Sequence, residues 1–75
     1  MGFDNRAIGD AIRTLRKERG LSQEVLSGLA GIARTHLTMI ENGVMCPSVE
    51  TLWKIAQAMD MRLSELLLRA EEKTE

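Results

Sequence analysis

One stretch, residues 21 to 43 (LSQEVLSGLAGIARTHLTMIENG), constrains the fold of this 75-residue chain more than any other. Ser22 precedes a segment with apolar residues at helical spacing, and a hydroxyl there accepts a hydrogen bond from an unpaired first-turn N–H. Apolar residues return at the same spacing beyond Gly31. Gly43 follows them, and glycine tolerates the left-handed conformation that closes many helices. The stretch therefore predicts two short helices joined by a tight turn.

Two helices joined by about three to four residues around a glycine form the helix-turn-helix layout. In that layout the second helix enters the major groove of DNA, with its N-terminal residues facing base edges. The side chains that point away from its apolar face are Arg34, Thr35, Thr38 and Met39. Arginine can grip a guanine edge or a phosphate, threonine can bond a base, and methionine supplies apolar contact. A solvated helix face would also explain the arginine and the threonines, so the spacing alone leaves both interpretations open.

The length and composition predict one globular helix-turn-helix domain over residues 1–75. Hydrophobic residues make up 44% of the chain and charged residues 28%, which is typical of a folded rather than a disordered protein. Apolar residues at helical spacing also occur on both sides of the central stretch. We expect an all-α fold with an acidic tail at 71–75 and helices at about 5–19, 22–29, 33–41, 49–59 and 63–70.

Three segments of the chain carry a family resemblance. LSQEVL, AGIARTHLTMIENG and PSVETLWKIAQAM resemble the Cro/phage-repressor (XRE-type) helix-turn-helix family over about residues 6–68. The resemblance implies a compact five-helix repressor-like domain and a transcriptional regulator that binds double-stranded DNA sequence-specifically. It further implies a homodimer on a palindromic operator, with half-sites about one helical turn apart. The size resembles the controller proteins of restriction–modification systems and small phage regulators.

The resemblance also assigns residues to roles. It implies base reading by Arg34, Thr35, Thr38 and Met39. Phosphate contact is implied for the neutral amides at either side of the reading helix, Gln23 and Asn42. An exposed helix-favouring residue would equally explain Gln23, and a helix-closing role would explain Asn42. We place His36 beside a phosphate or simply on an exposed helix surface.

A structural ion pair between Arg16 and Glu41 is implied as well. A carboxylate on the inner edge of a helix needs a partner, and an arginine fork can satisfy it with two hydrogen bonds. Arg16 belongs to a basic cluster with Arg13, Lys17 and Arg19. That cluster complements the negative C-terminal end of its helix, and one or two of its members are alternatively phosphate contacts.

The expected dimer interface contains Trp53 and Leu68. Trp53 is offset from the apolar stripe of its helix, and an exposed tryptophan in so small a domain suggests a contact surface. Residues 66 to 68 are three consecutive leucines, more apolar surface than a helix on one small core requires, so one of them should face a partner.

The charge balance favours a rival interpretation. Ten basic and eleven acidic residues give a formal net charge of −1, whereas a DNA-binding domain usually carries a basic footprint. The acidic residues are concentrated near the C-terminal end, which softens the objection. The rival is a protein-interaction module, such as an antitoxin-like subunit with weak or secondary DNA binding. It would hold a possible partner protein through the apolar residues Leu29, Val44, Met45 and Trp53.

No motif places a nucleophile beside a base, so we do not expect an enzyme. One histidine and one cysteine, Cys46, make no plausible metal site, and we expect neither a metal nor a cofactor. Apolar runs are too short to span a membrane, no charged-then-apolar leader precedes the first helix, and a single cysteine fits a reducing compartment. We therefore expect a cytoplasmic location.

Overall fold

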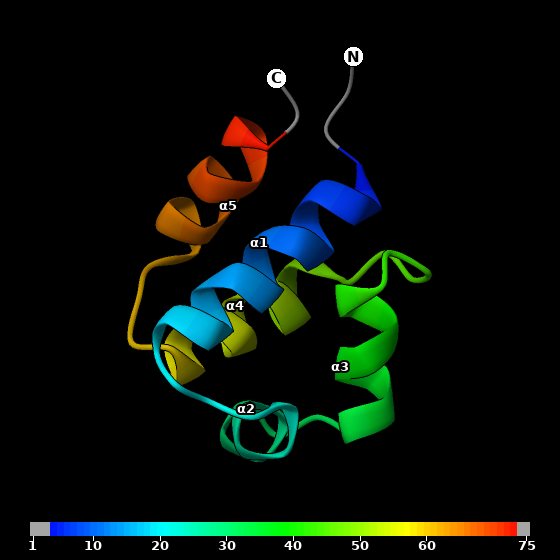
Figure 1. The fold of residues 1–75 in the computed structure, drawn as a ribbon, viewed down its shortest axis with the longest axis vertical. Coiled ribbons are helices and arrows are strands. Elements are labelled where there is room, and N and C mark those ends of the chain that lie inside the picture. Colours follow the sequence, from blue (N-terminus) through cyan, green and yellow to red (C-terminus); the bar gives the residue numbers. More distant parts are fainter. Residues whose placement is uncertain (1–3, 74–75) are drawn as a thin grey trace.

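Residues 4–73 of the chain, described by a computed structural model, contain five helices and no strand. The expected all-α, five-helix fold is confirmed. The helices surround one core and are joined by short turns and loops (Figure 1). Their bounds are Asn5–Glu18 for α1, Gln23–Ala30 for α2, Arg34–Glu41 for α3, Val49–Ala58 for α4 and Leu63–Glu72 for α5.

Every helix contributes to the core, because each carries apolar residues at helical spacing on one side. The largest side chains that are fully withdrawn from solvent come from all five helices. They are Ile12, Leu15, Leu26, Leu37, Ile40, Ile55 and Leu66.

Helix α1 connects the two sides of the molecule. It packs against α3 on one side and against α5 on the other, and α5 runs antiparallel to it (Figure 1). Helix α2 packs against both α3 and α4. The helix-turn-helix pair is thus supported by α1 and α4 and faces away from α5. Over residues 4–73 no helix has the length and apolar character needed to cross a membrane.

Four predicted helices are wrong by one residue at an end, and cap residues account for the differences. Ser22 and Ala33 have extended backbones, so they precede α2 and α3 as N-caps rather than opening these helices. Arg19 and Met59 are C-cap residues that follow α1 and α4. Helix α2 continues one residue beyond its predicted end, up to the left-handed glycine that closes it (φ 73°).

The last helix is longer than predicted. α5 continues to Glu72 instead of stopping at residue 70, so the first two residues of the predicted acidic tail are helical. Ala70 is buried, and two ion pairs hold this end of α5 against α1. Arg69 lies 3.2 Å from Glu18, and Lys73 lies 3.6 Å from Asp10. Residues 74 and 75 of the predicted tail lie outside the described residues.

Candidate nucleic-acid interface

Helices α2 and α3 form the predicted helix-turn-helix unit. Ser22 caps α2, its Oγ accepting a hydrogen bond of 3.1 Å from the backbone N–H of Val25. After Gly31, the N–H of Ile32 donates to the carbonyl of Ser27 at 3.0 Å, which closes the turn. Ala33 stands at the N-cap of α3 and has no side chain that can accept a bond there. Packing rather than capping therefore holds the first turn of α3 in place.

Helix α3 has one buried and one outward face. Leu37, Ile40 and Glu41 are buried against the rest of the molecule. The four predicted base-reading residues lie away from them: Arg34 and Thr35 are exposed, Met39 is 38% exposed, and Thr38 is half-buried. His36 is also half-buried. The structure thus brings the four residues together on one outward surface of two helical turns.

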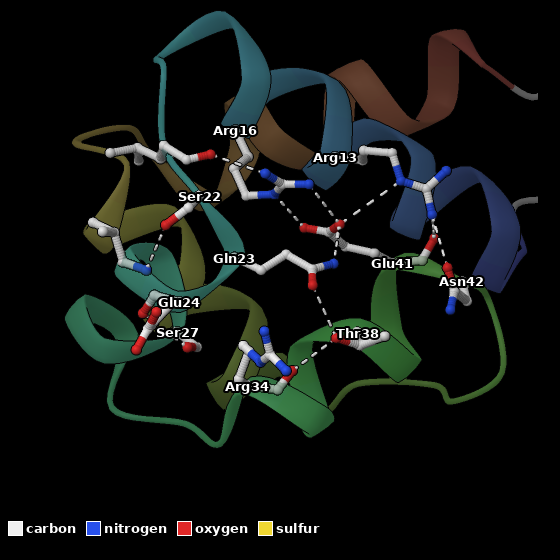
Figure 2. A network of polar contacts seen from close by, with 12 residues as sticks. Arg13, Arg16, Ser22, Gln23, Glu24, Ser27, Arg34, Thr38, Glu41 and Asn42 are labelled. Atoms are coloured by element: carbon white, nitrogen blue, oxygen red, sulfur yellow. Dashed lines mark hydrogen bonds and ion pairs between the residues drawn. The ribbon is translucent and has the colours of Figure 1, made fainter.

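The Arg16–Glu41 ion pair is present and fixes α3 to α1. Arg16 Nε donates to Glu41 Oε2 at 2.8 Å, and Arg16 Nη2 donates to Oε1 at 3.1 Å (Figure 2). The remaining nitrogen, Nη1, donates to the carbonyl of Leu21 at 2.9 Å. Glu41 is 3% exposed, so the bidentate guanidinium satisfies a carboxylate that water does not reach. Removing Glu41 would leave the buried Arg16 without its ion-pair partner, and removing Arg16 would leave Glu41 with only the partly exposed Arg13, at 3.7 Å, as a cationic partner.

Gln23 extends this network toward the outward face of α3. Its Nε2 donates to Glu41 Oε1 at 2.9 Å, and its Oε1 accepts a hydrogen bond of 3.0 Å from the hydroxyl of Thr38. Figure 2 shows the chain of contacts running from Arg16 through Glu41 and Gln23 to Thr38. The amide that sequence reasoning assigned to a phosphate is therefore engaged within the protein. One N–H of its Nε2 remains for an external acceptor.

Arg13 is a site residue that sequence reasoning named only as a member of the basic cluster on the first helix. Its Nη2 donates to the carbonyl of Glu41 at 3.0 Å and to Asn42 Oδ1 at 2.9 Å. The side-chain oxygen of Asn42 thus points toward Arg13, and its Nδ2 is left for an external acceptor. Its spacing could have indicated this role, because Arg13 lies three residues before Arg16 and therefore on the same face of the helix.

The structure does not bring Trp53 and Leu68 together. Trp53 is 51% exposed and lines a surface groove between α2 and α4, next to Leu29. Leu68 is 57% exposed and lines a different groove between α1 and α5, next to Arg19. The two predicted interface residues therefore belong to separate surfaces. Each is an exposed apolar group of the kind that a partner can cover.

Within residues 4–73, no group of three or more His, Cys, Asp or Glu side chains is arranged to hold a metal ion. Cys46 is exposed and unpaired with any other cysteine.

Comparison with known proteins agrees with this geometry. The family model HTH_3, described as helix-turn-helix, matches residues 12–66. The ImmF control region 10 kDa protein of Bacillus phage phi105 is 38% identical over 64 residues, which cover 85% of this chain and 71% of the phage protein.

Two solved structures are similar in both sequence and fold. The restriction–modification controller protein C.AhdI from Aeromonas hydrophila has a TM-score of 0.81 and 35% identity, over 83% of this chain and 94% of that one. SinR, the master regulator for biofilm formation, has a TM-score of 0.75 and 36% identity in its crystal structure with DNA. That match covers 80% of this chain and 97% of the SinR chain. The resemblance inferred from the residues is thereby confirmed, and the chain belongs to the HTH_3 (XRE-type) helix-turn-helix family of DNA-binding transcription regulators.

Proposed function

We propose that this chain binds double-stranded DNA sequence-specifically, as a homodimer on a palindromic operator, and regulates transcription from it. The observation that carries the proposal is the outward face of α3, where Arg34, Thr35, Thr38 and Met39 lie together while a buried ion pair fixes the opposite side of the helix. A helix held in this way enters the major groove with its reading side chains in a defined register. The similarity to a SinR structure that contains DNA supports the same interpretation.

The exposed face of α3 supplies distinct kinds of contact. Arg34 stands at the first position of the helix and reaches base edges, where a guanidinium bonds the O6 and N7 atoms of guanine. Thr35 bonds a base or contacts a thymine methyl, and Met39 contributes apolar contact. Discrimination among sequences then rests on these side chains and on Thr38.

Phosphate contacts position this face on the duplex without reading sequence. We assign them to the free N–H of the Gln23 amide, to Nδ2 of Asn42 and to His36. Arg13 adds a positive charge beside Asn42. No contact in this scheme requires a cofactor, and the proposed location remains the cytoplasm.

In the proposed homodimer, each copy contributes one recognition helix. Two copies on half-sites about 34 Å apart would each present α3 to one face of the duplex. Leu68 and Trp53 are the apolar groups that we assign to contacts between copies. Because they lie in separate grooves, substituting them one at a time distinguishes which surface is used.

A protein-interaction module remains the second candidate because of the exposed apolar residues. Leu29 is 62% exposed, Val44 is 71% exposed and Trp53 is 51% exposed, on a chain with a net charge of −1. Met45, which we expected on the same surface, is partly buried and packs against the core, so it is less accessible than the other three. Leu29 and Trp53 share a groove that a partner protein could cover.

Selection from a random duplex pool, at low and at moderate salt, tests the proposal. The wild type should enrich one palindromic sequence, and Arg34→Ala should relax its preference at one base pair per half-site. The cost on the preferred sequence should be about 1–3 kcal/mol. Arg62→Ala is the matched control, since Arg62 is also an exposed arginine at the start of a helix but precedes α5 as its N-cap. If the wild type enriches no sequence at either salt, the interaction module becomes the better interpretation.

A further inference from the structure

The hydroxyl of Thr38 faces two acceptors inside the protein. Its Oγ1 lies 3.0 Å from Gln23 Oε1 and 3.0 Å from the backbone carbonyl of Arg34. A threonine hydroxyl carries one hydrogen and two lone pairs. With either acceptor, the hydrogen of the hydroxyl points to an atom of the protein. Only lone pairs are left for a group outside.

The side-chain amide of Gln23 cannot flip so as to place its Nε2, in place of its Oε1, next to Thr38. Its Nε2 donates to Glu41 Oε1, and Glu41 is a carboxylate that accepts hydrogen bonds from Arg16 on both of its oxygens. Turning the amide by half a rotation would place two oxygens against each other with no hydrogen between them. Glu41 is 3% exposed, so water would not relieve that contact. The oxygen of the amide therefore stays toward Thr38, as Figure 2 shows.

We infer that Thr38 reads DNA as a hydrogen-bond acceptor, and that it recognises the exocyclic amine of adenine or cytosine in the major groove. The inference rests on the proposed DNA-binding function. In the major groove adenine presents N6 and cytosine presents N4 as donors, whereas guanine O6 and thymine O4 are acceptors. An acceptor-only hydroxyl bonds the amines and is repelled by the carbonyl oxygens. Unlike a free threonine, which serves either role, Thr38 discriminates between them.

Thr35 provides the internal comparison. It is exposed in the first turn of α3, and the network from Arg16 to Thr38 does not include it. Its hydroxyl can rotate to donate or to accept, as the base requires. Comparing the two threonines therefore distinguishes the effect of the hydrogen-bond network from the behaviour of any threonine hydroxyl in the major groove.

The test replaces single atoms of the selected operator. Thr38→Val removes the hydroxyl with little change of shape, and the base pair whose preference it relaxes is the one that Thr38 contacts. At that pair, adenine is replaced by unsubstituted purine, or cytosine by 2-pyrimidinone, to remove the amine. Separate duplexes lack the carbonyl oxygen of the opposite base. Affinities of wild type, Thr38→Val, Thr38→Ser and Thr35→Val are then measured on each duplex.

Loss of the amine should weaken wild-type binding about three- to tenfold, the range of one hydrogen bond. Thr38→Val should be insensitive to that loss, Thr38→Ser should keep the wild-type sensitivity, and Thr35→Val should leave it unchanged. The inference is wrong if Thr38→Val abolishes the sensitivity to loss of the carbonyl oxygen instead, or changes the sensitivity to loss of neither atom. Neither result contradicts the proposed sequence-specific DNA binding. If Thr38→Val relaxes no base pair, the inference is also wrong. Absence of any enriched sequence for the wild type removes the proposed function together with the inference.

Discussion

Gly9→Ala and Gly28→Ala make the same chemical change in two helices, and the structure predicts effects of opposite sign. Gly9 is buried where α1 crosses the end of α3. A Cβ at this position would overlap the carbonyl oxygen of Ile40 and would lie 2.6 Å from that of Glu41. Both atoms belong to the backbone, so no side chain can rotate away. The two helices would have to separate.

The magnitude follows from two opposing terms. Overpacking a tight site costs about 1–3 kcal/mol, and the upper end, about 3 kcal/mol, applies at Gly9 because the neighbours are backbone. Replacing glycine by alanine inside a helix stabilises the folded protein by about 1 kcal/mol. The net expected loss for Gly9→Ala is about 2 kcal/mol. On α2, a Cβ added at Gly28 would meet no atom of another element within 4 Å, so the alanine there should simply add about 1 kcal/mol.

Thermal denaturation followed by far-ultraviolet circular dichroism measures both variants. For a domain of this size about 1 kcal/mol shifts Tm by roughly 4–8 °C. Gly28→Ala should therefore melt about 4–8 °C above the wild type, and Gly9→Ala about 8–16 °C below it. A Gly9→Ala protein as stable as the wild type would mean that α1 and α3 do not approach as closely as described. A destabilised Gly28→Ala would refute the helix-propensity part of the reasoning.

Two further predictions concern the ion pair and the dimer. Glu41→Ala should lower the free energy of unfolding by about 3 kcal/mol or more, and Arg16→Met in the same chain should restore much of it; a loss below about 0.5 kcal/mol in urea denaturation, as at an ordinary surface site, would contradict the buried pair. Leu68→Glu or Trp53→Ala should shift the sedimentation coefficient toward that of a monomer and weaken operator binding while the helical content is kept. A dimer unchanged by both substitutions would place the interface elsewhere.

The fold was predictable because its signals are local. Ser22 and Ser48 mark helix starts, and both accept a bond from the backbone N–H three residues later. Gly31, the glycine in the predicted turn, takes the left-handed conformation (φ 73°). Core positions follow from helical spacing. The end of α5 was missed because its last turn depends on contacts with α1, which local patterns do not record.

The partners within the site were less predictable. The ion pair of Arg16 with Glu41 came from the family resemblance, since 25 residues separate the two in sequence. The assignment of Gln23 to a phosphate also came from the family resemblance, whereas its hydrogen bond to Glu41 depends on how α2 packs on α3. The sequence alone does not distinguish Gly9 from any other glycine within a helix. Only the crossing with α3 shows why a side chain has no room there.

Glu41 serves two purposes that one double variant can separate. In the Glu41→Ala and Arg16→Met combination, no buried charge is left unpaired, so much of the stability should return. The amide of Gln23, however, has lost the carboxylate that fixed its orientation and is free to direct its N–H toward Thr38. A donor there would occupy a lone pair of the hydroxyl that we assign to the base. The DNA affinity of the stability-restored double variant should therefore remain less sensitive to loss of the operator amine than that of the wild type. The atom-replaced duplexes measure this difference. If that sensitivity returns in step with the free energy of unfolding, Glu41 acts through stability alone and does not set the polarity of the reading residue.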